Sequence, residues 1–282
     1  MSKKLILQGP GADQATLARI AALAHPRTTT ALHPHALRCD GIDFSPELKA
    51  AVEAAAFEAR VDASFVDAGL SLADFRLVAM DMDSTLITIE CIDEIADMQG
   101  LKPQVSAITE AAMRGELDFS ESLKRRVALL EGLPVEALGR VYDERLAISM
   151  GGEAMLAGVQ AAGLHTLLVS GGFTFFTERL QQRLALDVTH ANVLEVVDGK
   201  LSGRVLGGVV DAEEKKRTVE RVCADLGIAP SQAIVMGDGA NDLKMMGIAG
   251  LSVAFRAKPV VREQADVALN FSGLDGLLNI LA

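Results

Sequence analysis

The sequence of 282 residues predicts an α/β fold, in which a doubly wound parallel sheet carries a helical cap insertion and a small α+β domain at the N-terminus. Three observations predict it. After Phe75, short continuously apolar runs alternate with helical stretches, which indicates the sheet. The segment between the first two runs has helical spacing and no convincing strand, which indicates the cap. Residues 1–74 follow a different order of elements, which indicates a separate small domain.

Residues 1–74 are predicted to form a ferredoxin-like unit with the element order β, α, β, β, α, β. The second helix has a clear start, because Ser45 is a typical N-cap, Pro46 suits the first helical position and Glu47 adds an acid to the first turn. The unit resembles a ligand-sensing ACT-type domain. We expect strands near residues 4–8, 28–32, 36–40 and 64–66, and helices near residues 13–24 and 46–60.

The core strands are apolar along their whole length, which is typical of a parallel sheet buried on both faces. They are expected at residues 77–80, 166–169, 233–236 and 251–254. Residues 193–209 instead predict two strands around a turn at Asp198-Gly199. The predicted cap is residues 88–150, and the predicted core is residues 75–87 and 151–282.

Composition excludes several classes of protein. No apolar run reaches the roughly 18 residues of a membrane span, and residues 1–8 lack the apolar core of a secretory signal, so we expect a soluble cytoplasmic protein. The formal net charge is −11 without a long basic block, which argues against a nucleic-acid partner. Cys39, Cys91 and Cys223 lack CxxC spacing, so we expect reduced core thiols and neither a zinc site nor a disulfide framework.

Polar residues follow three of the predicted core strands. Because open α/β sheets bind ligands at the carboxyl ends of their strands, we expect these residues to meet at one edge of the sheet. They bring together four carboxylates, a hydroxyl and several glycines. The three segments are Asp81-Met82-Asp83-Ser84-Thr85, Ser170-Gly171-Gly172 and Gly237-Asp238-Gly239-Ala240-Asn241-Asp242.

These residue types predict phosphoryl transfer with magnesium. Clustered carboxylates without a nearby histidine suit Mg²⁺, a hard cation that also binds phosphate oxygens. The glycines after Ser170 allow close backbone approach at a helix start, where N–H groups favour an anion. One member of the Asp81/Asp83 pair is expected to attack phosphorus while the other transfers protons. A lysine should balance the phosphate charge, and Lys215 and Lys216 are the candidates.

Each segment alone also has a structural explanation. Asp81 and Asp83 are typical of a turn and a helix N-cap, and the two glycine-containing segments are typical of tight turns. Three such segments at successive strand ends are hard to explain as turns. We therefore interpret them as one site.

The segments DMDST, SGG and GDGAND, with a lysine before the last and a helical insertion after the first, resemble the motifs of the haloacid dehalogenase superfamily of phosphohydrolases, and within it the phosphoserine phosphatase family. The resemblance covers about residues 75–282 and implies Asp81 as nucleophile and Asp83 as general acid and base. It implies Mg²⁺ bound by Asp81, Asp238 and the Asp83 backbone carbonyl, with Asp242 in support. The implied phosphate-binding residues are Ser170, Gly171, Lys215 and Asn241, and the adjacent Lys216 leaves a one-residue ambiguity.

In the predicted cap, Glu90 and Arg126 match the family's substrate-binding glutamate and arginine. Phosphoserine has an ammonium and a carboxylate, so a selective pocket needs an acid and preferably an arginine. Helical geometry favours Arg126 over Arg125, because Arg126 flanks the apolar stripe of Leu123, Val127 and Leu130. An acid in a first helical turn and a snorkelling surface arginine are the alternative explanations. Met113 and Phe119 are similar to the family's apolar pocket wall, although core packing explains them equally well.

The resemblance implies hydrolysis of O-phospho-L-serine to L-serine and phosphate through an aspartyl-phosphate intermediate, the last step of serine biosynthesis. The alternatives are a same-fold phosphatase or phosphotransferase acting on another small phosphate monoester, and a sensor with an idle core. The intact set of nucleophile, acid, lysine and metal aspartate argues against the sensor. The expected partner is a small-molecule substrate. The oligomeric state, including a homodimer, and the role of residues 1–74 stay open.

Overall fold

The computed structural model describes residues 2–113 and 116–282. Its first part consists of β1 (Lys3–Gln8), α1 (Gln14–Ala21), β2 (Thr28–His33), β3 (Ala36–Ile42), α2 (Pro46–Glu58) and β4 (Asp62–Asp67). The four strands form an antiparallel sheet in the order β2-β3-β1-β4, and the helices pack on one face around Leu5, Leu17 and Val52. This is the expected ferredoxin-like arrangement. Ser45 accepts a hydrogen bond from the Leu48 N–H at 3.1 Å, which confirms the predicted start of α2.

The second sheet is the core of the fold. Its strands are β5 (Leu77–Met80), β6 (His165–Phe173), β7 (Val188–Val197), β8 (Lys200–Leu206), β9 (Ala233–Gly237), β10 (Leu251–Phe255) and β11 (Val267–Leu269). They lie in the order β11-β10-β9-β5-β6-β7-β8, and neighbours are parallel except for the antiparallel pair β7 and β8. The α/β fold class with a parallel sheet is confirmed.

Three details of the sheet differ from the sequence predictions. Strand β6 continues to Phe173, past an irregular register, so Gly171 and Gly172 lie at the end of a strand and the next helix begins only at Thr174. Strand β7 begins at Val188, where it pairs with β6, and β11 was not predicted at all. A three-residue edge strand has too few positions for its apolar pattern to be recognised.

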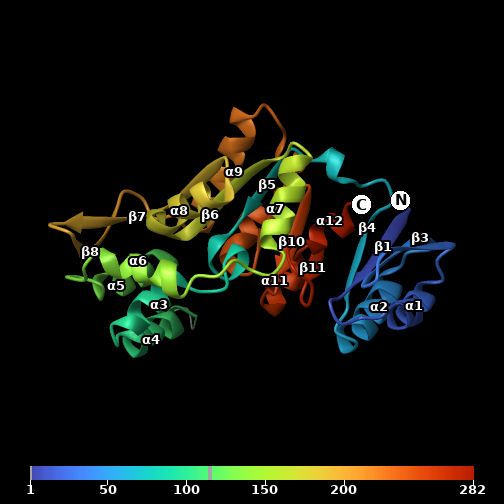
Figure 1. The fold of residues 1–282 in the computed structure, drawn as a ribbon, viewed down its shortest axis with the longest axis horizontal. Coiled ribbons are helices and arrows are strands. Elements are labelled where there is room, and N and C mark those ends of the chain that lie inside the picture. The colour runs from blue at the N-terminus through green and yellow to red at the C-terminus, as the bar shows by residue number, and fades with distance from the viewer. Residues whose placement is uncertain (1, 114–115) are drawn as a thin grey trace.

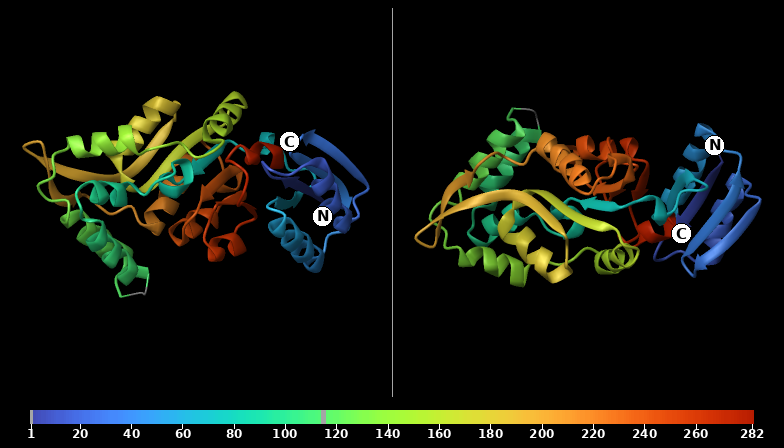
Figure 2. Two further views of the ribbon diagram at one scale, coloured as in Figure 1. Left: turned by 60° about the horizontal axis from the view of Figure 1, so that its bottom comes forward. Right: turned by 90° about the horizontal axis from the view of Figure 1, so that it is seen from above.

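Helices cover both faces of this sheet (Figures 1 and 2). They are α7 (Gly152–Ala161), α8 (Thr174–Leu184), α9 (Ala212–Asp225), α10 (Leu243–Met246), α11 (Pro259–Gln264) and α12 (Gly276–Ile280). Strand β5 shows why its sequence is continuously apolar: Val78 and Met80 belong to one core cluster, while Leu77 and Ala79 belong to the other. Alternate side chains of a strand point to opposite faces, and here both faces are buried.

In the described part of the segment between β5 and α7, four helices form the cap. They are α3 (Cys91–Met98), α4 (Lys102–Met113), α5 (Phe119–Ala128) and α6 (Glu136–Glu144). The two segments that connect the cap to the core pair with each other, since the Thr88 N–H donates to Ala147 O at 3.0 Å and the Ser149 N–H donates to Leu86 O at 2.9 Å. The described part of residues 88–150 is therefore helical, as predicted, and is attached through a paired double connection.

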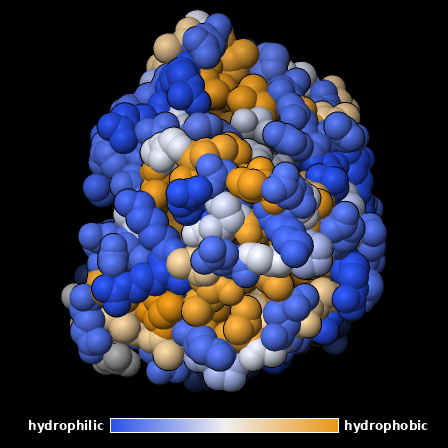
Figure 3. Space-filling model, turned by 90° about the vertical axis from the view of Figure 1, so that its left-hand side faces the viewer, coloured by the Kyte–Doolittle hydropathy of each residue, from blue (hydrophilic) through white to orange (hydrophobic). Residues whose placement is uncertain are grey.

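The β7–β8 hairpin extends beyond the core sheet to the cap. The Gly132 N–H donates to Leu201 O at 2.8 Å, and the Val135 N–H donates to Gly199 O at 3.0 Å. The hairpin also has exposed apolar side chains, namely Val193, Val196, Val197 and Leu206. On the face of the molecule that carries the cap, hydrophobic side chains gather in clusters between hydrophilic ones (Figure 3).

The N-terminal unit and the cap lie at opposite ends of the core (Figures 1 and 2). Buried polar side chains attach the N-terminal unit to the core. The Asp62 carboxylate accepts hydrogen bonds from the N–H groups of residues 270–272, and the Lys4 ammonium donates to Leu70 O and Ala282 O. Buried polar groups need such partners. The N-terminal unit is thus packed on the core, at the end remote from the cap.

The three cysteines are buried and unbridged, as expected. Within residues 2–113 and 116–282, no helix has both the length and the apolar character needed to cross a membrane.

Candidate active site

The chain makes a tight turn directly after β5. Asp81 is the first residue after the strand, and a π-helical turn follows at Met82–Leu86. Within this turn Asp83 and Ser84 have non-helical backbone angles, and the Asp81 carboxylate accepts the Met82 N–H at 2.7 Å. Local hydrogen bonds of this kind are what Asp commonly makes at turns. They fix Asp81 at the carboxyl end of a central strand, where the sequence predicted the site.

A buried lysine joins two of the carboxylates. The Lys215 ammonium lies 2.8 Å from Asp81 Oδ2 and 2.8 Å from Asp242 Oδ1, and its side chain is 1% exposed. Burial lowers the pKa of Lys215, but the Asp242 and Asp81 charges outweigh it and raise the pKa above its usual value. Lys215 is therefore a permanent positive charge at the bottom of the site.

The same contacts decide between the two candidate lysines. Lys216 pairs with Glu220 on the surface, at 3.7 Å. Lys215 shares its helix face with Thr218, Val219 and Val222, at positions i+3, i+4 and i+7, and all three are buried. The amphipathic period of α9 was thus a signal in the sequence that favoured Lys215.

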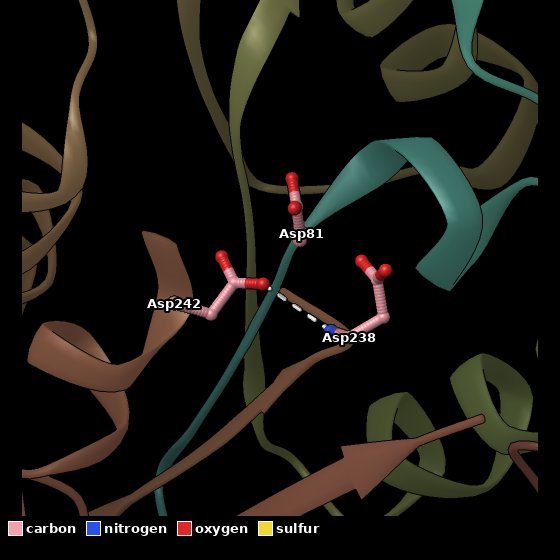
Figure 4. Close-up of side chains that lie close together, drawn as sticks. All are labelled: Asp81, Asp238 and Asp242. Carbon is pink, nitrogen blue, oxygen red and sulfur yellow. Dashed lines mark hydrogen bonds between the residues drawn. The ribbon is translucent and has the colours of Figure 1, made fainter. Parts of the chain in front are cut away.

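Three aspartates converge at the ends of β5 and β9 (Figure 4). Asp81, Asp238 and Asp242 each have a carboxylate oxygen within 4.8 Å of the others. Asp242 is fully buried, and its Oδ2 accepts the N–H groups of Asp238 at 3.2 Å and Gly239 at 3.1 Å. Three carboxylates face one ammonium, so the cluster has an excess negative charge of about two when ionised. Oxygen ligands with this excess fit a divalent metal ion.

The electrostatics of the cluster agree with that fit. Burial first, and then the Asp242 charge, raise the pKa of Asp81, while Lys215 opposes the increase. Burial and the Asp242 charge also raise the pKa of Asp238, to about 6. Burial and the Glu90 charge raise the pKa of Asp83 to about 7. Crowded, buried carboxylates bind protons more readily unless a cation neutralises them.

The Ser170-Gly171-Gly172 segment lies against the Asp81 turn. The Ser170 hydroxyl accepts the Gly172 N–H at 2.9 Å. A Cβ atom on Gly172 would lie 2.9 Å from Asp83 Oδ2, and one on Gly171 would lie 3.0 Å from Phe119 Cζ. Glycine lets the strand end approach the proton-transfer candidate and the cap closely, and a larger residue would displace these side chains.

A cleft of about 280 Å³ opens between this edge of the sheet and the cap. It contains every predicted site residue except Lys215 and Asp242, which are buried. The predicted residues that line it are Asp81, Asp83, Glu90, Arg126, Ser170, Gly171, Asp238 and Asn241. Phe119 also lines the cleft, whereas the Met113 side chain lies outside the described part of the chain.

Arg126 and Arg125 point to different sides of α5. Arg126 lines the cleft, and Arg125 pairs with Glu121 on the exposed face at 2.7 Å. Burial lowers the pKa of Arg126, and the charges of Asp93, Glu90 and Asp83 oppose this. A guanidinium stays protonated in such a setting. The helical periodicity thus predicted the correct arginine for the cleft.

Three polar cleft residues were missed from the sequence, namely Asp93, Thr109 and Lys258. Asp93 lies three residues after Glu90 in the first turn of α3, so helical spacing was a signal for it. Lys258 follows β10, the fourth predicted strand, and its N–H donates to Asp238 O at 3.1 Å. The strand-end rule would have found it if applied to that strand. A larger groove of about 670 Å³ lies between α2 and α11, but its described lining residues do not include this carboxylate cluster.

Comparison with known proteins agrees with this geometry. Residues 78–247 match the model of the haloacid dehalogenase-like hydrolase family. The sequence is 57% identical over 217 residues to a phosphoserine phosphatase of Polaromonas sp., an alignment that covers 75% of this chain and 92% of that protein.

Two solved structures are similar over nearly the whole chain. A HAD-family hydrolase from Salmonella enterica serovar Typhi has a TM-score of 0.91 at 33% identity, with 100% of this chain and 99% of that chain covered. A probable phosphoserine phosphatase from Vibrio cholerae, in unliganded form, has a TM-score of 0.84 at 35% identity, with 99% and 86% covered. Both matches include the N-terminal unit.

Replacement of Lys215 by Met is expected to lower the free energy of unfolding by about 3–5 kcal/mol, because two buried carboxylates lose their shared cation. The loss should shrink as the pH falls, since protonation removes the uncompensated charges. Urea unfolding in the presence of EDTA, at several pH values, measures this change in the free energy of unfolding. Lys216→Met is the matched control and should change stability by less than about 1 kcal/mol. Equal stability of both variants would contradict the assignment.

Proposed function

Because the chain belongs to the haloacid dehalogenase-like hydrolase family, we propose that it hydrolyses O-phospho-L-serine to L-serine and phosphate through an aspartyl-phosphate on Asp81, with Mg²⁺ as cofactor. The observation that carries this proposal is a single cleft in which the Asp81 and Asp83 carboxylates face the cap residues Glu90 and Arg126. The phosphatase of Polaromonas sp., at 57% identity, supports the choice of substrate. The reaction is the last step of serine biosynthesis.

In the first step, an oxygen of Asp81 forms a bond to phosphorus, and the bond between phosphorus and the serine oxygen breaks. Asp83 gives its proton to the departing oxygen. In the second step Asp83 takes a proton from water, the water oxygen attacks phosphorus, and the Asp81 carboxylate is released. A pKa of about 7 suits Asp83 to both transfers near neutral pH.

Four groups are proposed to hold the phosphoryl oxygens. They are the Ser170 hydroxyl, the Gly171 backbone, the Lys215 ammonium and the Asn241 amide, and except for Lys215 they line the cleft. Lys215 lies 2.8 Å from the nucleophile and so also favours the ionised form of Asp81, which burial disfavours. Fixed donors aimed at a transferring phosphoryl group stabilise its transition state.

Asp81, Asp238 and the Asp83 backbone carbonyl would hold Mg²⁺. When bound, Mg²⁺ would neutralise the clustered carboxylates and polarise the phosphoryl group. Asp242 is proposed to support the site from below, because its oxygens are already hydrogen-bonded to Lys215 and to the backbone that carries Asp238.

Selectivity is proposed to come from the cap. Arg126 would bind the substrate carboxylate through its planar guanidinium, and Glu90 would bind the ammonium. We also propose that residues 88–150 act as a cap domain that closes over a core of residues 75–87 and 151–282, with residues 1–74 as a separate domain. The paired connection at residues 86–88 and 147–149 supports motion of the cap as one body.

Phosphate release from a panel of small phosphates tests the function. Phosphoserine is expected to be preferred over phosphothreonine, phosphoethanolamine and p-nitrophenyl phosphate, and EDTA should stop the reaction until Mg²⁺ is restored. Acceptor alcohols should not divert the phosphoryl group. Preference for another monoester would overturn the substrate, and activity in excess EDTA would overturn the metal.

Asp81→Asn is expected to lower kcat by at least roughly a thousandfold, because an amide is a poor nucleophile and a poor metal ligand. Far-UV circular dichroism should stay unchanged. Asp225→Asn, at an exposed position, is the control and should retain full activity. Substantial turnover by Asp81→Asn would contradict the role of Asp81 as the nucleophile.

Arg126→Ala is expected to lower kcat/KM for phosphoserine by about 100-fold, as for the loss of charged hydrogen bonds, and that for p-nitrophenyl phosphate far less. Of these two substrates only phosphoserine has a carboxylate, so only phosphoserine loses a contact with Arg126. Arg125→Ala removes an outward-facing guanidinium of the same helix and serves as the control. Equal losses for both substrates would remove Arg126 from the selectivity pocket.

A further inference from the structure

Ser84 has an unusual backbone conformation for a residue other than glycine. Its φ of 56° and ψ of 1° lie in the left-handed region, where a side chain causes strain. The Ser84 N–H donates to Ile89 O at 3.2 Å, so this conformation closes the turn between the Asp81 strand and α3. Glycine would adopt it more readily. The backbone conformation therefore does not explain why this residue is a serine.

The Ser84 hydroxyl donates a hydrogen bond to Glu90 Oε1 at 2.7 Å. Within the described part of the chain, the Glu90 carboxylate makes no other side-chain hydrogen bond or ion pair. Its backbone is fixed at the start of α3, where Glu90 O accepts the N–H groups of Asp93 and Glu94. The hydroxyl thus restrains the one part of Glu90 that is otherwise free to rotate, and it leaves the second carboxylate oxygen available.

Charges of both signs surround Glu90. It lines the same cleft as the carboxylates of Asp83 and Asp238, which repel it, and the guanidinium of Arg126, which attracts it. Charge alone therefore does not fix the orientation of the exposed Glu90 side chain. A charge-assisted hydrogen bond from the Ser84 hydroxyl favours one orientation.

We propose that Ser84 is a positioning residue that holds the Glu90 carboxylate in the cleft, with one oxygen facing the ammonium of an amino-substituted phosphate monoester. This inference rests on the proposed function and deepens it. Ser84 lies one residue after the proton-transfer candidate Asp83 in the same turn. Selectivity for the ammonium would then be set by the turn that carries the chemistry as well as by the cap.

Ser84→Gly separates the hydroxyl from the backbone, because glycine keeps the left-handed conformation without strain. The variant is expected to raise KM for phosphoserine and for phosphoethanolamine about tenfold, as for the loss of a hydrogen bond to a charged group, with a much smaller change in kcat. Phosphoglycolate and p-nitrophenyl phosphate lack the ammonium, so their KM values should change least. Steady-state kinetics with these four substrates measures the pattern.

Two further variants test whether the effect acts through Glu90. Ser84→Asn is a conservative rescue, since Asn tolerates the left-handed region and its amide can donate to the carboxylate, so it should recover part of the loss. In a Glu90→Ala background, Ser84→Gly should have no additional effect on KM for phosphoserine, because the partner is already absent.

The outcomes separate the inference from the function. Failure of the parent protein to hydrolyse phosphoserine would overturn the proposed function and the role of Ser84 with it. With that activity present, equal KM changes for all four substrates would show that Ser84 supports only the turn. No change for the two amines, or full additivity with Glu90→Ala, would likewise overturn the positioning role.

Discussion

The rest of the site depends on the two ion pairs that Lys215 forms with buried carboxylates. Asp81 extends from β5 and Asp242 from the loop after β9, and neighbouring parallel strands bring these like charges together below the cleft. Without a cation between them the carboxylates would bind protons or move apart, and Asp81 would be a poor nucleophile. The lysine on α9 favours the ionised form of the nucleophile, and through Asp242 it is linked to the backbone that carries Asp238. A single buried ammonium thus links three elements that are far apart in the sequence.

The fold determines which groups in the cleft act on phosphorus and which are proposed to recognise the rest of the substrate. The carboxyl ends of β5, β6 and β9 provide rigid positions for the groups that act on phosphorus, because both faces of the sheet are packed with apolar side chains. The cap provides the groups proposed to recognise the rest of the substrate. Gly171 and Gly172 allow these two halves to meet closely, since larger residues would displace the side chains of Phe119 and Asp83. The Ser84–Glu90 bond crosses the same boundary.

The N-terminal unit is built and attached differently. Its own core surrounds Leu5, Leu17 and Val52. It is attached to the phosphatase core by hydrogen bonds that the Asp62 carboxylate accepts and by one that the Lys4 ammonium donates to Ala282 O. It lies at the end of the molecule opposite to the cap (Figure 1). Among the described residues, none of residues 2–74 lines the cleft.

The sequence by itself determined the parts of this protein that depend on local pattern. Continuous apolar runs predicted the four central strands, the N-cap and proline predicted the start of α2, and helical period selected Arg126 over Arg125. The rule that ligands bind at strand ends gathered Asp81, Ser170 and Asp238 into one site. These predictions were confirmed because each depends on a pattern that can be read within a single helix or strand, namely its periodicity or the position of its carboxyl end.

Only the tertiary structure decided how separate elements meet. It showed that Lys215 rather than Lys216 contacts the carboxylates, placed Lys258 and Asp93 in the cleft, and paired Ser84 with Glu90. It also extended β6 through the glycines and attached the β7–β8 hairpin to the cap. Such contacts depend on the packing angles and distances between helices and strands. A pattern within one element can favour a residue, as the period of α9 favours Lys215, but the contact itself is a property of the assembled core.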